Sequence, residues 1–170
     1  EWFDEFFELG NGCICCSVKD DLVNTLERLL ERRDRFDYIL VETTGMANPG
    51  PLAATFWVDE ELECKLRLDG IVTLVDSKNV LGQLERASNG ASSVETLHQI
   101  AYADRILLNK TDLVSESHLH NIKEAVGQIN PIAATTCTVR SCVDLTTILD
   151  IQAFDATRIA RADEILSQQN

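Results

Sequence analysis

The sequence predicts an α/β fold with a doubly wound, mostly parallel β-sheet. Short, almost continuous apolar runs alternate with segments in which apolar residues recur at helical spacing. Strands that are apolar nearly throughout are typical of a parallel sheet, because helices cover both of its faces. The length of 170 residues, with 45% hydrophobic and 25% charged residues, fits one globular domain with a sizeable core.

The pattern places the elements in order along the chain. A short strand is expected over residues 5–9, running into a turn at 10–12. A helix is expected from Val18 to about Arg33, with acidic residues in its first turn and arginines in its last, as the helix dipole favours. The other predicted strands span residues 38–41, 71–75, 106–108 and 132–139, and the other helices span 80–86, 94–103, 116–129 and 156–166, with an exposed loop over 87–93.

Four polar residues follow the predicted strand at 106–108, namely Asn109, Lys110, Thr111 and Asp112. Ligands bind beyond the carboxyl ends of the strands in such sheets. An Asp carboxylate can accept hydrogen bonds from N1–H and the 2-amino group of guanine, a donor pair that adenine lacks. An Asn amide can bond the base edge and brace neighbouring loops, and a Lys stem can lie along the base plane. The pattern indicates a guanine site; the alternative is a helix start with Thr111 or Asp112 as its cap.

A second polar segment, Glu42-Thr43-Thr44-Gly45, follows the predicted strand at 38–41. In a nucleoside triphosphatase, a carboxylate at this place would orient Mg²⁺ or its water shell, and a glycine would let a backbone N–H approach the γ-phosphate. The alternative is a plain strand end before a turn at 48–51. The position upstream of the guanine-type motif in the same sheet favours the catalytic interpretation of Glu42 and Gly45.

Three cysteines fall within four residues, at Cys13, Cys15 and Cys16. Near-adjacent cysteines rarely form disulfides, whereas thiolates are good ligands for Zn²⁺ or cuprous copper. Gly10 and Gly12 permit a turn that directs the three sulfurs toward one ion. The N-terminus of the helix that follows would favour thiolates. Three protein ligands leave a fourth position open, which suits transfer of the metal. The alternative is a set of buried thiols in a core turn.

Net charge and the lengths of the apolar runs exclude two classes of partner. A net charge of −13 opposes binding to nucleic acid. No apolar run approaches the roughly 20 residues that span a bilayer, so no membrane partner is expected. A cytoplasmic location is expected, with the nucleus and a plastid left open.

His98 is a candidate extra metal ligand, with an ordinary helix-face residue as the alternative. Packed thiols and solvated imidazoles without a role in the site are expected at Cys64, Cys137, Cys142, His118 and His120.

Four stretches, in order, resemble the CobW-type metal-chaperone GTPases, and within them the eukaryotic zinc-regulated GTPase metalloprotein activators. These stretches are GNGCICCSVKDDL, ILVETTGMANPGP, DGIVTLVD and HQIAYADRILLNKTDL. The joint occurrence of CICC, ETTG and NKTD makes the resemblance specific. It implies a P-loop NTPase-like fold, with a GTPase domain over residues 1–155 and a helical segment over residues 156–170 that leads to a C-terminal domain.

The resemblance also implies a role for each motif, and with it the ligands Zn²⁺, GTP and Mg²⁺. The three clustered cysteines match the family's CxCC metal motif. Glu42 and Gly45 match the glutamate on the Mg²⁺ side and the glycine that faces the γ-phosphate. The segment from Asn109 to Asp112 matches the guanine motif. A stretch that lies beside the nucleotide in the family matches Cys16, Ser17, Val18, Lys19 and Asp20.

Members of the family hydrolyse GTP and deliver zinc to a client apo-metalloenzyme, which in the eukaryotic branch is a methionine aminopeptidase. Nothing in this sequence resembles the family's phosphate loop, GxxGxGKT, or its small C-terminal domain. The expectation is therefore a fragment whose sheet lacks its first strand and phosphate loop, and which alone binds GTP weakly without turnover. The alternative is a non-catalytic thiolate metal-binding or interaction protein derived from such a GTPase. A thiol redox protein is disfavoured, because no thioredoxin-type context surrounds the cysteines.

Overall fold

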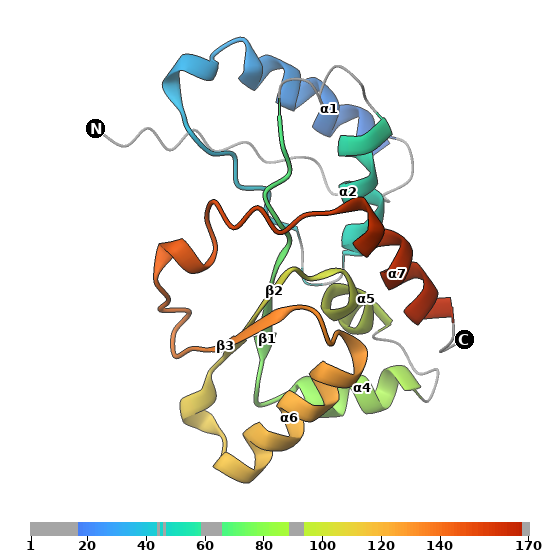
Figure 1. The fold of residues 1–170 in the computed structure, drawn as a ribbon, viewed down its shortest axis with the longest axis vertical. Helices are drawn as coiled ribbons and strands as arrows, with labels where there is room; N and C mark the ends of the chain where they lie inside the picture. The colour runs from blue at the N-terminus through green and yellow to red at the C-terminus, as the bar shows by residue number, and fades with distance from the viewer. Residues whose placement is uncertain (1–16, 44, 46, 59–65, 89–93, 168–170) are drawn as a thin grey trace.

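The computed structural model describes residues 17–43, 45, 47–58, 66–88 and 94–167. Its strands are β1 (Val72–Asp76), β2 (Arg105–Asn109) and β3 (Ala134–Cys137). Short 3-10 helices lie at Arg33–Arg35, Thr111–Leu113 and Leu145–Thr147. The α-helices, drawn with the strands in Figure 1, are α1 (Ser17–Leu30), α2 (Pro49–Val58), α4 (Val80–Ser88), α5 (Val94–Tyr102), α6 (Glu116–Ile129) and α7 (Ala156–Ser167).

The three strands form a parallel sheet in the order β1-β2-β3. In the register of β1 and β2, Asp76 is the partner of Asn109, so both strands end at the same edge. Strand β2 is the central one, and its residues Ile106, Leu107 and Leu108 are buried. The α/β class and the parallel sheet predicted from the sequence are confirmed.

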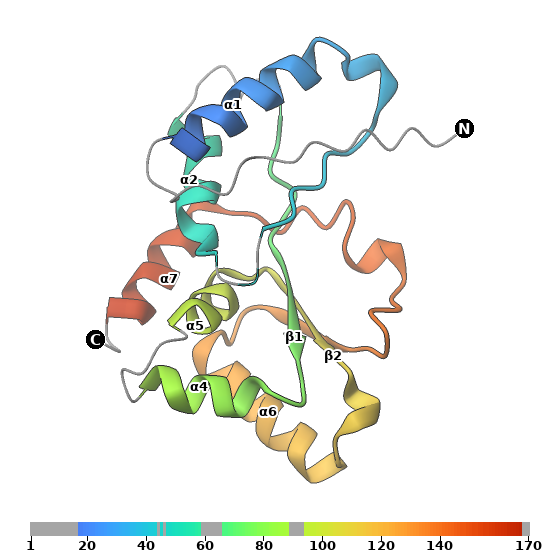
Figure 2. The same ribbon diagram turned by 180° about the vertical axis from the view of Figure 1, so that it is seen from behind.

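The main core lies between this sheet and the helices that connect its strands. Its fully buried side chains come from α4, α5, β2 and α6, and each contributes about 1.5–3 kcal/mol by leaving water. They include Val80, Ile100, Ile106, Leu108, Ile122 and Val126. A smaller core joins α1 to α2 at the other end of the molecule, where Leu22 and Leu26 are buried. Figure 2 shows α1 and α2 at that end and α4 and α6 at the opposite one.

A buried asparagine fixes the connection from α5 to β2. The Nδ2 atom of Asn130 donates to the carbonyl oxygens of Ile100, Ala101 and Ala103 at 2.8, 3.2 and 2.8 Å. Its Oδ1 atom accepts from the backbone N–H groups of residues 132 and 133 at 3.2 and 3.0 Å. One side chain therefore joins the end of α5 to the segment that leads into β3.

The C-terminal helix α7 packs against α5. Ala162 is buried in the main core, and the Tyr102 hydroxyl donates to the Asp163 carboxylate. Burial is the first cause that raises the pKa of Tyr102, followed by its hydrogen bond to Asp163. The connection into α7 is held by Asp69, whose carboxylate accepts from the backbone N–H groups of Ile151 and Gln152 at 3.0 and 2.7 Å.

Most of the predicted helices are confirmed. Helix α6 has the predicted bounds, and α4, α5 and α7 differ from the prediction by one or two residues at their ends. The turn expected at 48–51 is wrong, because helix α2 begins there, at Pro49. Asn48 precedes the helix and accepts from the Gly50 N–H at 3.0 Å, while Pro49 stands at the first helical position, where its missing N–H costs nothing. The predicted strand at 5–9 lies outside the described residues.

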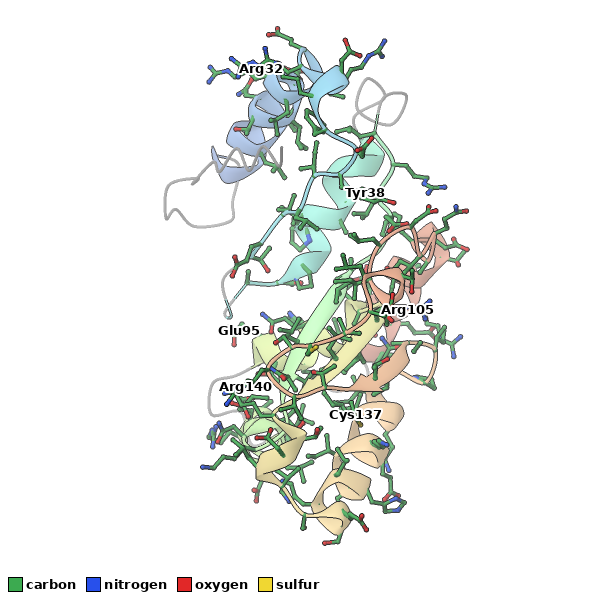
Figure 3. The ribbon with its side chains drawn as sticks, turned by 90° about the vertical axis from the view of Figure 1, so that its left-hand side faces the viewer. Arg32, Tyr38, Glu95, Arg105, Cys137 and Arg140 are labelled. Atoms are coloured by element: carbon green, nitrogen blue, oxygen red, sulfur yellow. The ribbon has the colours of Figure 1, made fainter. Side chains whose placement is uncertain are left out.

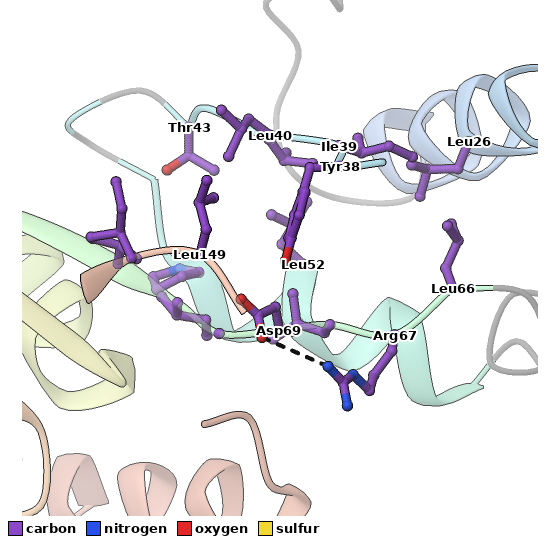
Figure 4. A pocket seen from close by; sticks show the side chains of 18 of the residues that line it. Leu26, Tyr38, Ile39, Leu40, Thr43, Leu52, Leu66, Arg67, Asp69 and Leu149 are labelled. Carbon is purple, nitrogen blue, oxygen red and sulfur yellow. Dashed lines mark ion pairs between the residues drawn. The ribbon is translucent and has the colours of Figure 1, made fainter. Parts of the chain in front are cut away.

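The predicted strand at 38–41 is wrong. These residues follow an irregular path, and a cavity of about 500 Å³ separates them from residues 66–72 (Figure 4). A strand needs a hydrogen-bonded neighbour, and no strand among the described residues lies beside this segment. Apolar side chains of the segment remain exposed, with Leu40 at 82%. Burial on both faces also fails for β1, whose Leu74 is 55% exposed.

Across the described part of the chain, no helix combines the length and the apolar character that a membrane span requires.

Candidate functional site

The candidate site lies at the carboxyl ends of β1 and β2. Asn109 is the last residue of β2, and the chain turns there because Lys110 adopts the left-handed conformation, with φ 62° and ψ 33°. This conformation is uncommon for a residue with a side chain, and it costs about 1 kcal/mol. A 3-10 turn over Thr111–Leu113 follows. The chain therefore bends sharply where the sequence predicts base recognition.

The Asn109 amide braces the loop that follows β3. Its Oδ1 accepts from the Ser141 N–H at 2.8 Å and from the Thr138 hydroxyl at 3.2 Å, and its Nδ2 donates to the Ser141 hydroxyl at 2.8 Å. Arg140 and Ser141 both have positive φ angles, 53° and 55°. Figure 3 shows Arg140 in the lower half of the molecule and Tyr38 in the upper half. The amide thus braces the loop after β3 against the end of β2, as expected for one of its two roles, and its contact with a base edge stays a prediction.

Lys110 is held by a residue of the neighbouring strand. Its Nζ atom lies 2.7 Å from Oδ2 of Asp76, the last residue of β1. Asp76 also accepts from the backbone N–H of Lys78 at 2.9 Å and from Nδ2 of Asn79 at 3.0 Å. The hydrogen bond from Lys110 is the main cause that holds the pKa of Asp76 below its ordinary value.

The Asp112 carboxylate is exposed and makes no hydrogen bond or ion pair with any residue that the structure describes. Thr111, beside it, donates through its hydroxyl to the Thr138 carbonyl at 3.1 Å. The alternative reading of these residues as a helix cap is wrong, because α6 begins at Glu116 and its cap is Ser115, whose hydroxyl accepts from the His118 N–H. Asp112 therefore has its acceptor oxygens available to a ligand.

The segment that carries Glu42 and Gly45 is tied to α5. The side-chain amide of Gln99 donates to the carbonyl oxygens of Gly45 and Ala47, both at 3.1 Å. Glu42 and Gly45 are exposed, and a Cβ placed on Gly45 would have no neighbour among the described atoms within 4 Å. The backbone at Gly45 is therefore open to a ligand from that side.

The cysteine cluster Cys13, Cys15 and Cys16 lies outside the described residues, so its predicted geometry stays a prediction. The next four residues, Ser17 to Asp20, form the first turn of α1. Within the described ranges, no three histidine, cysteine or acidic side chains are grouped as a metal site would need, so His98 gains no further ligand there.

Two of the scattered cysteines contradict the prediction of packed thiols. Cys137 and Cys142 are exposed, because β3 is an edge strand and Cys142 lies in the loop beyond it. Cys64 lies outside the described residues. Of the two histidines expected to be solvated, His120 is exposed and His118 is half-buried.

Sequence reasoning missed four residues of this site: Asp76, Gln99, Thr138 and Ser141. Asp76 could have been found by the rule that already led to Asn109, since it is a polar residue at the end of an apolar run. Gln99, Thr138 and Ser141 contact the site from positions that are distant in sequence, so no local sequence pattern predicts them.

Comparison with known proteins decides the family of this chain. Residues 3–136 match the model of the CobW/HypB/UreG nucleotide-binding domain. The chain belongs to the CobW/HypB/UreG family. The Schizosaccharomyces pombe zinc-regulated GTPase metalloprotein activator 1 is 39% identical over 171 residues, which cover 100% of this chain and 40% of that protein. The Saccharomyces cerevisiae protein of the same name is 38% identical, over 93% of this chain and 40% of its own length.

A bacterial member of the CobW/HypB/UreG family provides a structural comparison. The crystal structure of the Zn(II)-bound YjiA GTPase from Escherichia coli matches with a TM-score of 0.68 at 31% identity, over 82% of this chain and 42% of that one. The chain therefore spans less than half the length of the relatives that it matches.

Proposed function

We propose that this chain is the guanine-recognising and thiolate-bearing part of a GTP-dependent zinc chaperone, which hydrolyses GTP and passes zinc to a client metalloenzyme. The loop after β2 carries the proposal. There Asn109 and Lys110 are fixed by contacts with neighbouring segments, while the Asp112 carboxylate is exposed. Such a carboxylate can accept two hydrogen bonds from guanine, and none of the donors it needs is present on adenine.

Zinc is proposed as the cargo, and Cys13, Cys15 and Cys16 as its thiolate ligands. Helix α1 begins directly after the third cysteine, and the N–H groups of a helix N-terminus favour thiolates. Because Cys16 belongs both to the thiolate cluster and to the proposed nucleotide-side segment, Cys16–Asp20, binding of GTP would alter the metal site. The names of the fungal relatives support zinc as the metal. Methionine aminopeptidase is the proposed client, by resemblance to the eukaryotic activators.

Two residues of the loop tied to α5 are proposed to act at the phosphates. Glu42 would hold Mg²⁺ or its water shell, since its exposed carboxylate offers the hard oxygen ligands that Mg²⁺ prefers. When bound, Mg²⁺ neutralises charge on the phosphate oxygens. The open backbone at Gly45 would donate its N–H to the γ-phosphate.

The cavity between residues 36–41 and 66–72 is proposed as the place of one further strand, the one that leads to the phosphate loop. Both borders carry apolar side chains, and the first of them has the sequence of a buried strand although it lacks regular secondary structure here. A strand between them would give both borders a hydrogen-bonded neighbour.

Zinc titration of the purified, reduced chain against a chromophoric chelator tests the metal site. We expect one zinc per chain, and we expect tight binding to be lost when Cys13, Cys15 and Cys16 are replaced by serine. The matched control replaces Cys137 and Cys142, two exposed thiols outside the cluster, and it is expected to bind zinc as the unchanged chain does.

Nucleotide binding separates this proposal from the alternative of a non-catalytic metal-binding protein. If the chain binds zinc but shows no preference for guanine over adenine nucleotides, the GTPase assignment is wrong and the alternative holds. If the triple serine variant binds zinc as tightly as the unchanged chain, the thiolate site is wrong.

A further inference from the structure

We infer that Asp76 is a positioning residue for guanine binding, because it holds the Lys110 side chain in place beside Asp112. The inference rests on the proposed guanine site and deepens it. According to this inference, the turn after β1 forms one wall of the guanine site, although it lies outside the motif from Asn109 to Asp112.

The sheet itself brings Asp76 to this place. Asp76 and Asn109 are register partners in neighbouring parallel strands, so Asp76 stands beside the residue that precedes Lys110. A backbone hydrogen bond from the Ser77 N–H to the Asn109 carbonyl, 3.0 Å long, continues the pairing one step beyond the strands. The position of the Asp76 backbone relative to the motif is therefore set by strand pairing.

The carboxylate of Asp76 is itself immobilised by the turn. Its Oδ1 accepts from the Lys78 N–H, and its Oδ2 accepts from both Asn79 Nδ2 and Lys110 Nζ. The side chain of Asp76 is 25% exposed, whereas that of Lys110 is 50% exposed. Asp76 is thus the less exposed partner, with the larger number of hydrogen bonds among the described residues, and it anchors the lysine.

Lys110 needs such an anchor more than the other motif residues do. A lysine stem has four rotatable bonds, and fixing them costs about 2 kcal/mol of rotamer entropy. Asn109 is already fixed by Ser141 and Thr138, and the Asp112 side chain has only two rotatable bonds. With Asp76 as a partner, the stem is held extended toward β1 before a base arrives, so less entropy is lost on binding.

NMR titration of the isotope-labelled 170-residue chain with guanosine 5′-monophosphate tests the inference without requiring tight phosphate binding. We expect shifts at residues 109–112 and about two- to fivefold weaker binding in Asp76→Asn, because a half-exposed ion pair contributes only modestly. Lys110→Met should weaken binding to a similar extent, and the double variant should be no weaker than either single one. Asp150→Asn, which removes the same charge at an exposed position on another loop, should leave binding unchanged.

Inosine 5′-monophosphate provides a readout that a merely structural role of Asp76 would not give. It lacks the 2-amino group, so the ratio of guanosine to inosine nucleotide affinity reports on Asp112. If Asp76 acts through the lysine stem, Asp76→Asn weakens both nucleotides and keeps that ratio. If the substitution distorts the whole loop, the ratio falls toward one, and the inference is wrong.

The two levels of the proposal fail in different ways. If the unchanged chain shows no guanosine-specific shifts, the proposed guanine site is wrong and the role of Asp76 falls with it. If the unchanged chain binds and Asp76→Asn binds equally well, or if the effects of the two single variants add in the double variant, the role of Asp76 alone is refuted.

Discussion

Replacing Asn130 by alanine would test how β2, the strand that ends at the proposed guanine site, is held in place. The side chain is 8% exposed and makes five hydrogen bonds, three to carbonyl oxygens at the end of α5 and two from N–H groups before β3. Alanine can replace none of them. The variant therefore leaves several buried backbone groups without a partner.

The expected cost can be worked from these contacts. A buried hydrogen bond contributes about 0.5–1.5 kcal/mol net, and a donor left unsatisfied costs about 1–3 kcal/mol. Because the three carbonyl oxygens share two N–H groups and some freed groups will reach water, we expect Asn130→Ala to lower the free energy of unfolding by about 3 kcal/mol. For a chain of this size that corresponds to a fall in Tm of about 6–12 °C.

Urea unfolding followed by circular dichroism measures this cost directly. The matched control is Asn121→Ala on the exposed face of α6, which should change the free energy of unfolding by less than about 0.5 kcal/mol. A loss below about 1 kcal/mol in Asn130→Ala, with an unchanged slope against urea, would show that the five bonds do not hold this junction.

Two further results are expected from measurements of the same kind. Gly50→Ala should destabilise the protein by about 1–3 kcal/mol, because its Cβ would stand 2.6 Å from the Tyr102 ring. Gly127→Ala, on the open face of α6, should instead stabilise the protein by up to about 1 kcal/mol. Equal effects of the two substitutions would contradict the packing of Gly50 against Tyr102. Since the folded pKa of Asp76 lies below its ordinary 3.8, the carboxylate stabilises the fold above that pH, and the benefit is lost as the pH falls through the folded pKa. The stability gap between the unchanged chain and Asp76→Asn should thus be present at neutral pH and shrink below about pH 3.8 in acid titrations of the urea midpoint; a gap independent of pH would be inconsistent with this pair.

The helices could be predicted from sequence where one face is apolar and the ends carry clear signals. The bounds of α6 follow from its periodicity, with Ser115 as the cap. Helix α2 escaped prediction because proline and glycine in its first turn resemble a loop, although Asn48 followed by Pro49 is also a helix start signal. The apolar composition of residues 38–41 predicts a buried strand, because it indicates burial. A strand also needs a hydrogen-bonded neighbouring strand, which the sequence pattern does not reveal.

The candidate site was predictable to the extent that it is local. The segment from Asn109 to Asp112 stands out because polar residues with distinct roles follow an apolar run. The bracing of Asn109 by Ser141 and the anchoring of Lys110 by Asp76 involve partners more than 30 positions away, and they arise only when the sheet is formed. The exposure of Cys137 likewise depends on the edge position of β3, which composition does not encode.

The hydrogen bonds from Gln99 connect α5 to the segment that carries Gly45. The helix has nine residues and is about 13 Å long. Its last turn grips the Gly45 carbonyl through Gln99, and its end runs directly into the strand that finishes at Asn109. Because Ile100 is wholly buried, tilting this helix would disrupt the core. Among the described residues, the Gln99 side chain holds the Gly45 segment through two hydrogen bonds, about 1 kcal/mol each. The helix is therefore a rigid support, and these two hydrogen bonds can break without moving the strand that ends at Asn109.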